Sequence, residues 1–319
     1  MPYQVGHDPN RVNAMELLVG SFEDMKSEFY EVKYGEIQWR DVIPEASVDT
    51  SINPGATSTS YRVYDQRGKG SFRSQHDNGV PTVGQTLGKN IVPIEVAGVS
   101  AIFDTEDARQ IQFGHNQSLL SELPNVMRKA CERHVEGTVF FGDENIQDFQ
   151  GWLDYAGVTI TTVGNGAGGN PEWNTKTPDE ILGDINDAIS AVWNGTKQVH
   201  LPDTVYLPGT QLAFIAAFRI PEINMTVLEF IKANNIYTAL TGQELTIKSV
   251  RYLDGAGAGG TDRMVVAETN AENVTLPFPL PFDLLEPQER GFDVELYAEY
   301  KFGSFHMRYP ASMIYVDGI

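Results

Sequence analysis

Two glycine-rich stretches have the spacing that other proteins use to hold the phosphates of a dinucleotide. The first comprises Gly164, Gly166 and Gly169, and the second comprises Gly255, Gly257 and Gly260. Such a loop binds phosphate where it opens a helix, because the helix N-terminus then presents free N–H groups to the anion. Asn170 and Pro171 follow the first stretch, and a strand-like segment from Arg263 follows the second. Both stretches are therefore interpreted as loops rather than nucleotide sites.

The other reactive side chains form no pattern that predicts catalysis. The histidines are scattered: His7, His76, His115, His134, His200 and His306. Neither a His-Glu-x-x-His zinc motif nor a Gly-x-Ser-x-Gly nucleophile elbow occurs. The single cysteine, Cys131, excludes an internal disulfide, and its place on an apolar helix face favours a buried structural thiol. We therefore predict that the protein is not an enzyme and has no catalytic residue, cofactor or metal ion.

The chain has a strongly acidic balance. Its 319 residues include 43 acidic and 23 basic side chains, which gives a net charge of −20. This balance argues against a protein that grips nucleic acid, because neutralising phosphates requires lysine and arginine. It is compatible with a protein that lies near DNA without adhering to it, and equally with acidity that serves solubility alone. No apolar run reaches the roughly 18 residues of a membrane span, and the first residues lack the pattern of a secretory signal.

A long amphipathic helix is predicted over residues 123–140. Apolar or small side chains recur there at helical spacing: Leu123, Val126, Met127, Ala130, Cys131, Val135, Thr138 and Val139. This spacing places a continuous apolar stripe on one helix face, which needs a packing partner. Pro124 is expected in the first helical turn, where its missing N–H has no cost. Phe140-Phe141-Gly142-Asp143 is expected to end the helix.

The residues before this helix contain little material for a core. An acidic helix is predicted between residues 13 and 33, and residues 46–100 are rich in turn-forming residues. A basic loop lies within the second segment, with the side chains Arg62, Arg67, Lys69 and Arg73 against the single acid Asp65. On a chain of this charge, the four basic residues are candidates for contact with an acidic surface of another copy. A solvated loop with incidental charge remains the alternative.

The residues after the helix resemble a folded α/β domain followed by strands. Thr177 and Glu180 form a predicted capping box for a helix over residues 178–193. Strict alternation of apolar and polar residues over 292–302 predicts a strand, and we expect it to form an antiparallel hairpin with residues 305–309 after a turn at Gly303. The fold class is therefore α+β.

Several segments resemble the major capsid proteins of tailed bacteriophages with the Hong Kong 97-like fold, which are related to the encapsulins. The family often carries a step similar to Phe-x-Gly-Asp followed by Gly-Leu-Leu-Asn. The corresponding residues here are Phe140-Phe141-Gly142-Asp143 and Gly151-Trp152-Leu153-Asp154. The region around Lys129-Ala130 and Glu132 resembles the long spine helix of the family, and residues 293–319 resemble its final strands.

The resemblance implies a division of the chain into five parts. These are an N-terminal arm (1–45), an E-loop (46–98), a peripheral or P-domain segment with the spine helix (99–154), an axial or A-domain (155–280) and P-domain return strands (281–319). The helix stripe is then expected to pack on strands around Leu296, Tyr300, Phe305 and Met307. Some family members cross-link an E-loop lysine to a neighbour, for which Lys69 is the available residue, but charge pairing is the default expectation.

The implied function is self-assembly into the icosahedral head shell that encloses the double-stranded DNA of a tailed phage. The implied partners are further copies in hexamers and pentamers, together with scaffold, portal and decoration proteins, and no membrane. The protein would be assembled in the host cytoplasm and located in the virion. Two alternatives remain open: an encapsulin-type nanocompartment shell and an acidic cytosolic α/β enzyme or ligand-binding domain.

Overall fold

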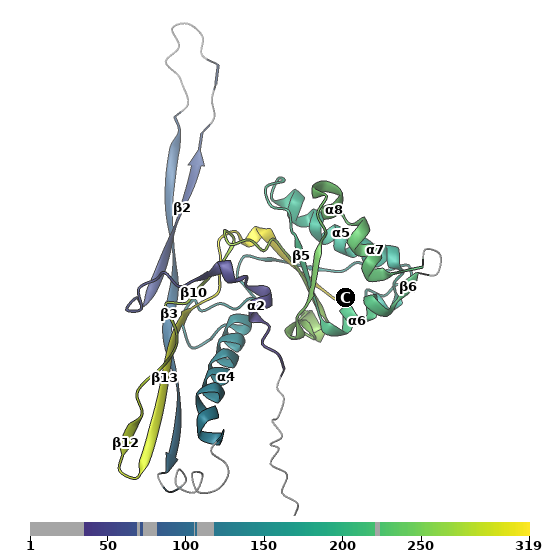
Figure 1. Cartoon of the computed structure of the whole chain (residues 1–319). Coiled ribbons are helices and arrows are strands. Elements are labelled where there is room, and N and C mark those ends of the chain that lie inside the picture. The colour runs from purple at the N-terminus through teal and green to yellow at the C-terminus, as the bar shows by residue number, and fades with distance from the viewer. Residues whose placement is uncertain (1–34, 69–70, 73–81, 105, 107–117, 221–223) are drawn as a thin grey trace, which may run out of the picture. The chain divides into compact units, whose positions relative to one another are not determined.

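A computed structural model describes residues 35–68, 71–72, 82–104, 106, 118–220 and 224–319. The chain divides into two compact units, Met1–Glu36 and Ile37–Ile319, and every contact discussed below lies within the second. The helix expected between residues 13 and 33 therefore lies outside the described residues. The second unit contains two large sheets with different strand orders (Figure 1).

The first sheet is built around one very long strand. Its strands lie in the order β11-β13-β3-β2, with β12 also paired to β13. Their bounds are β2 (Ser58–Arg67), β3 (Gly84–Asp104), β11 (Leu280–Leu284), β12 (Gln288–Arg290) and β13 (Asp293–Gly303). Residues 84–93 of β3 run antiparallel to β2, and residues 94–104 run antiparallel to β13. A two-stranded ribbon, made of β2 and the first half of β3, therefore extends beyond the rest of the sheet (Figure 1).

The helix α4 (Ser118–Phe141) packs on one face of this sheet. Met127 shares a buried cluster with Leu296 of β13, and Cys131 shares a second cluster with Tyr300. The Tyr300 hydroxyl also lies 2.8 Å from Nδ1 of His134. The expected packing of the helix stripe on the strand around Leu296 and Tyr300 is confirmed.

The start of α4 differs from the sequence expectation. The helix begins at Ser118 rather than Leu123, so Pro124 lies inside it and not in its first turn. Proline marks a helix start only on average, because its ring also fits the helical φ while one backbone hydrogen bond is lost. Pro124 does lie in a helix, as predicted, but the helix begins before it.

The end of α4 explains the aromatic-Gly-Asp step. Gly142 has a left-handed φ of 74°, which reverses the chain. The N–H groups of Trp152 and Leu153 then donate to the carbonyl oxygens of Val139 and Phe140, at 2.8 and 3.0 Å. These bonds satisfy carbonyls that a helix end otherwise leaves without partners.

The second sheet is mixed and has the order β4-β15-β9-β5-β8. The bounds of its strands are β4 (Thr159–Thr162), β5 (Thr204–Leu207), β8 (Thr246–Ser249), β9 (Arg263–Ala267) and β15 (Met313–Asp317). The helices of this region are α5 (Pro178–Gly195), α6 (Gly209–Ala217), α7 (Val227–Asn234) and α8 (Ile236–Thr241). The capping box of Thr177 and Glu180 is present, so α5 begins where the sequence predicted.

Both faces of the second sheet are covered. On β9, Met264 and Val266 belong to the cluster that contains the buried residues of α5, whereas Val265 belongs to the cluster that contains Phe140 of α4. Side chains alternate across a strand, so one buried strand serves two cores. The second sheet is thereby joined to the end of α4.

The prediction of a hairpin at the C-terminus is wrong. β13 pairs with β3 along its whole length, while β14 (His306–Met307) pairs with β10 (Val274–Pro277) in a small sheet that also contains β1 (Val48–Asp49). The chain leaves the first sheet after Gly303. The next residue, Ser304, still donates its N–H to the Pro93 carbonyl oxygen at 3.1 Å. The last strand, β15, lies in the second sheet between β4 and β9. Alternation correctly predicted a strand with one buried face, but it carries no information about the partner.

The remaining elements are short. They are α2 (Trp39–Val42), β6 (Arg219–Ile220), β7 (Met225–Thr226) and the 3₁₀ turns Glu45–Ser47, Trp173–Thr175, Arg251–Leu253, Ala258–Gly260 and Pro310–Ser312. Trp39 of α2 is buried and donates its indole N–H to Glu132 of α4 at 3.0 Å, which fixes α2 to the long helix. Within the described part of the chain, no helix is long and apolar enough to cross a membrane.

Candidate assembly surfaces

One side of the β2–β3 ribbon gathers basic and large apolar side chains. In the antiparallel register, Arg62 lies opposite Lys89, Tyr64 opposite Leu87, and Ser60 opposite Ile91. Directly opposed residues share a face of the sheet, so these side chains project to the same side. We call Arg62, Tyr64, Leu87, Lys89 and Ile91 the ribbon face. Its three large apolar members are 58–65% exposed.

The charges of the ribbon face are uncompensated. Arg62 and Lys89 are exposed, and neither forms an ion pair within the described residues. Like charges directly opposite each other destabilise a strand pair. An acidic surface placed on the ribbon face would remove this repulsion.

The structure describes only part of the predicted basic loop. Arg62 lies on the ribbon face, and Arg67 is the last residue of β2, with its backbone paired to Gly84. Lys69 and Arg73 lie outside the described residues. Lys89 and its apolar neighbours were not predicted from the sequence, because only the register between two strands places them beside Arg62.

The root of the ribbon is fixed to the body of the unit. The ring of Tyr61 stacks on His306 of β14, with 4.8 Å between centroids and 10° between planes. The guanidinium of Arg308 lies 5.3 Å from the centroid of the same tyrosine ring. Burial, reinforced by the nearby Arg308 charge, lowers the pKa of His306 to about 4. The imidazole is therefore neutral at pH 7, which lets it lie beside the guanidinium.

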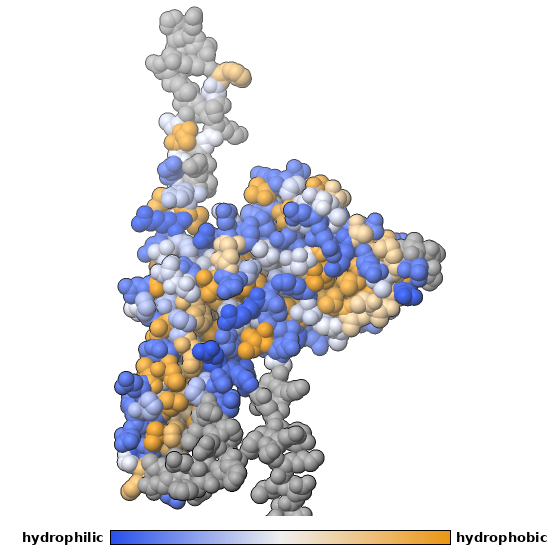
Figure 2. Space-filling view, viewed as in Figure 1, coloured by the Kyte–Doolittle hydropathy of each residue, from blue (hydrophilic) through white to orange (hydrophobic). Residues whose placement is uncertain are grey.

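A second surface has the opposite character. On the face of the first sheet away from α4, Val96 and Ile102 of β3 are 60% and 62% exposed. The acids Asp283 of β11 and Glu299 of β13 lie directly opposite each other in the register. We call Val96, Ile102, Asp283, Tyr297 and Glu299 the outer sheet face. Figure 2 shows apolar side chains among charged ones along the ribbon and over the first sheet.

In both glycine-rich stretches, carboxylates of the chain itself accept hydrogen bonds from backbone N–H groups. In the first stretch, Glu180 accepts a hydrogen bond from the Ala167 N–H at 2.6 Å while it also completes the cap of α5. In the second stretch, the N–H groups of Gly255 and Ala258 donate to Asp262 and Asp317 at 3.1 and 3.0 Å. Backbone donors that could hold a phosphate are therefore already bonded.

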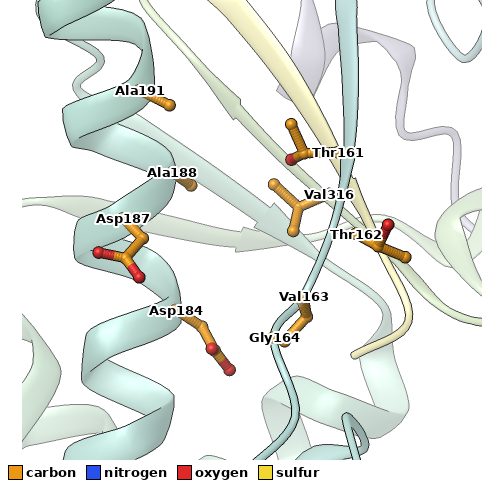
Figure 3. A pocket seen from close by; sticks show the side chains of 9 residues that line it. All are labelled: Thr161, Thr162, Val163, Gly164, Asp184, Asp187, Ala188, Ala191 and Val316. Carbon is orange, nitrogen blue, oxygen red and sulfur yellow. The ribbon is translucent and has the colours of Figure 1, made fainter.

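A cavity of about 220 Å³ lies between β4 and α5. Figure 3 shows Asp184 and Asp187 of α5 on one side of it and Thr161 and Thr162 of β4 on the other. Asp184 is paired with the buried amine of Lys176 at 2.7 Å. Burial raises the pKa of Asp184, against the opposing effect of this lysine. An acidic lining disfavours phosphate, and the paired aspartate is explained by its structural contacts.

The remaining reactive groups have structural environments. Cys131 is 4% exposed, and burial raises its pKa to about 12, so the thiol is not a nucleophile at neutral pH. In the described residues, no group of three His, Cys, Asp or Glu side chains is arranged to hold a metal ion. His7, His76 and His115 lie outside those residues.

A long helix packed on an extended sheet, a protruding ribbon and a second α/β region together define the Hong Kong 97-like capsid fold. Three solved structures support this assignment. The capsid of Myoviridae phage XM1 matches with a TM-score of 0.77 and 16% identity, over 99% of this chain and 100% of that one. A chain from Gordonia phage Cozz gives 0.60 and 15% over 99% and 97%, and the capsid of a native GTA particle gives 0.62 and 12% over 95% and 98%.

The family model described as "Major capsid protein" matches residues 68–319. The chain belongs to the major capsid protein family, whose members are structural proteins. No protein with a curated description matches it significantly. Family and fold together define a head-shell protein of the kind that tailed phages build, a protein that associates with itself and is part of the virion.

Proposed function

We propose that this capsid protein builds an icosahedral head around double-stranded DNA, and that the ribbon face is the arm by which each subunit holds a neighbour. The observation that carries this proposal is the exposure of Tyr64, Leu87 and Ile91 on a ribbon without a core of its own. Exposed apolar side chains in such a group are typical of an interaction site. Arg67, Lys69 and Arg73 are the other basic residues of this part of the sequence and would belong to the same contact.

The outer sheet face of a second copy is the surface that fits this arm. It offers the carboxylates of Asp283 and Glu299 to Arg62 and Lys89, and it offers Val96 and Ile102 to the apolar members of the ribbon face. Complementary charges fix the register of such a contact, while apolar burial supplies most of its free energy. The repulsion between Arg62 and Lys89 would then be relieved only in the assembled shell.

The domain division follows from this function, with one adjustment. Residues 1–45 would be the N-terminal arm, 46–98 the E-loop, 99–154 and 281–312 the P-domain, and 155–280 the A-domain. Residues 313–319 are better assigned to the A-domain, because β15 pairs with β4 and β9. Hexamers and pentamers would be the assembly units. Scaffold, portal and decoration proteins would join them in the host cytoplasm.

The net charge of −20 suits the interior of a DNA-filled shell. An acidic wall does not neutralise phosphates, so packaged DNA would not adhere to it. Purified shells that contain nucleic acid would support the phage head. Shells that contain a cargo protein would favour the encapsulin alternative instead.

Assembly of the expressed protein tests the proposal. Size-exclusion chromatography and negative-stain microscopy should show discrete shells for the unmodified chain. The double variant R62E/K89E and the triple variant R67E/K69E/R73E should each remain folded subunits by circular dichroism and lose shell formation.

A pair of variants separates the ribbon face from the ribbon as a whole. Y64A/L87A should reduce shell yield, whereas T86A on the opposite side of the ribbon should not, although Thr86 is also exposed. Normal shell yield from Y64A/L87A and from both charge variants would reject the proposal that the ribbon face holds a neighbouring subunit.

A further inference from the structure

A cavity at the root of the ribbon has the composition of a receptor for an anion. It has a volume of about 340 Å³ and lies between β2 and the segment that follows β14. The side chains that matter here are Tyr61, Arg62, Asn90, His306, Arg308 and Tyr309. We call this cavity the root pocket. Its lining includes two arginines and no carboxylate.

Arg308 is available to a ligand, because it is exposed and forms no ion pair within the part of the chain that the structure describes. Arg62 borders the pocket, but its side chain belongs to the ribbon face, on the other side of β2 from Tyr61. The Tyr61 ring holds the Arg308 guanidinium in place by a cation–π contact. Asp49 is the carboxylate that acts on Tyr61, but its Oδ1 accepts hydrogen bonds from the N–H and hydroxyl of Ser51 at 3.0 and 2.6 Å.

The pocket also contains a buried polar atom without a partner. His306 is 6% exposed, and its Nε2 has no hydrogen-bond partner. The Tyr61 and Thr275 hydroxyls are buried beside it, but these two groups interact with each other. Leaving a buried polar group without a partner costs about 1–3 kcal/mol. A group supplied from outside the subunit would give the Nε2 of His306 its missing partner.

The chemistry of the lining selects the occupant. Guanidinium groups bind carboxylates through paired, charge-assisted hydrogen bonds, and the Asn90 amide adds a neutral donor. A second copy of this chain is the richest source of carboxylates in a shell, since 43 of its 319 residues are acidic. We propose that the root pocket receives an aspartate or glutamate side chain of a neighbouring subunit. The inference rests on the proposed function and adds a second contact at the opposite end of the ribbon from its tip.

Zero-length cross-linking of assembled shells tests the proposal. Carbodiimide joins an amine to a carboxylate only where the two are in contact, and arginine does not react, so R308K places a reactive group in the root pocket while keeping the charge. Shells are assembled from a mixture of unlabelled and ¹⁵N-labelled R308K subunits. We expect mass spectrometry to find an amide between position 308 and an acidic residue in peptides of mixed isotope, which identifies a link between chains.

The variant R40K is the matched control for the chemistry. Arg40 forms an exposed ion pair with Glu132 of its own chain at 2.9 Å, so R40K should give a link within one chain only. Shells in which R40K links normally but position 308 links to nothing, or only to its own chain, would overturn the proposal. If the unmodified chain forms no shells, the proposed function fails instead.

Further measurements test the root pocket if R308K assembles poorly, and they distinguish a carboxylate of a neighbour from a small anion. If R308K subunits do not assemble alone, co-assembly with an excess of unmodified subunits supplies the same readout. R308Q should raise the critical subunit concentration for assembly about tenfold or more, as the loss of a charge pair at an interface predicts. If inorganic phosphate stabilises the unassembled subunit through Arg308 while shells show no link between chains, the pocket binds a small anion and the proposal is wrong.

Discussion

The guanidinium of Arg263 pairs with the carboxylate of Asp317, with Nε 2.6 Å from Oδ1 and Nη2 3.0 Å from Oδ2. The same guanidinium donates through Nη1 to the Leu153 carbonyl oxygen at 2.7 Å. Arg263 lies on β9, Asp317 on β15, and Leu153 in the segment that returns from α4. One buried arginine therefore joins the second sheet to the end of the long helix.

Removing this arginine should destabilise the subunit strongly. Both side chains are at least nine-tenths buried, so R263A leaves a buried carboxylate without its counter-charge, although the Ala258 N–H still donates to it. The expected loss is about 3–5 kcal/mol in the free energy of unfolding. R40A is the control, because the Arg40–Glu132 pair is largely exposed and should contribute less than about 1 kcal/mol. Urea unfolding of the unassembled subunit measures both, and equal losses would contradict the assigned role.

Gly151 should tolerate no side chain. A Cβ at this position would collide with the Phe140 carbonyl oxygen and with the N–H of Gly142, both of which are backbone atoms. G151A should therefore disrupt the end of α4 and lower the free energy of unfolding by several kcal/mol. Gly137 lies inside α4 with open space around it, so G137A should instead stabilise by about 0.5–1 kcal/mol. Thermal unfolding compares the pair, and the same sign for both would refute the explanation of the glycine step.

Acid should weaken the root of the ribbon through His306. The charged or titratable groups that face it are Tyr61, Tyr155 and Arg308. The pKa of His306 is about 4 in the folded chain and near 6.5 when unfolded. As the pH falls from 6.5 to 4, His306 binds a proton in the unfolded chain but not in the folded chain, so the free energy of unfolding falls across this interval.

The variant H306Q isolates this contribution in the unassembled subunit. Between pH 7.5 and 5.0 the unmodified chain should lose about 2 kcal/mol more than H306Q, because other titrating groups are common to both. Urea titrations at the two pH values measure the difference. An identical pH dependence of the two proteins would show that His306 is not held neutral by the fold.

Cys131 should report on the packing of α4 against the first sheet. The thiol is buried beside Tyr300, and its pKa is raised to about 12. A thiol-specific reagent at pH 8 should therefore label the native subunit hardly at all and label one thiol per chain in urea. Rapid labelling of the native subunit would mean that the helix does not cover Cys131.

Local patterns in the sequence predicted the elements whose causes are local. The stripe from Met127 to Val139 predicted the packing face of α4, and the capping box of Thr177 and Glu180 predicted the first residue of α5. Both depend on neighbours within one or two helical turns, so the chain itself contains the information. Pro124 misled the placement of the helix start because the same residue fits two positions in a helix.

Pairings between distant strands were decided only by the tertiary structure. Alternation along residues 292–302 predicted a strand with one buried face. Its partners are β11 and β12, which precede it, and β3, about 200 residues earlier, and not the next strand. The ribbon face and the root pocket have the same origin. Arg62 meets Lys89, and Tyr61 meets His306, only because a particular register and a particular chain reversal bring them together. Sequence fixes what each side chain can offer, whereas the contact it makes depends on which of many compatible strands the folded chain places beside it.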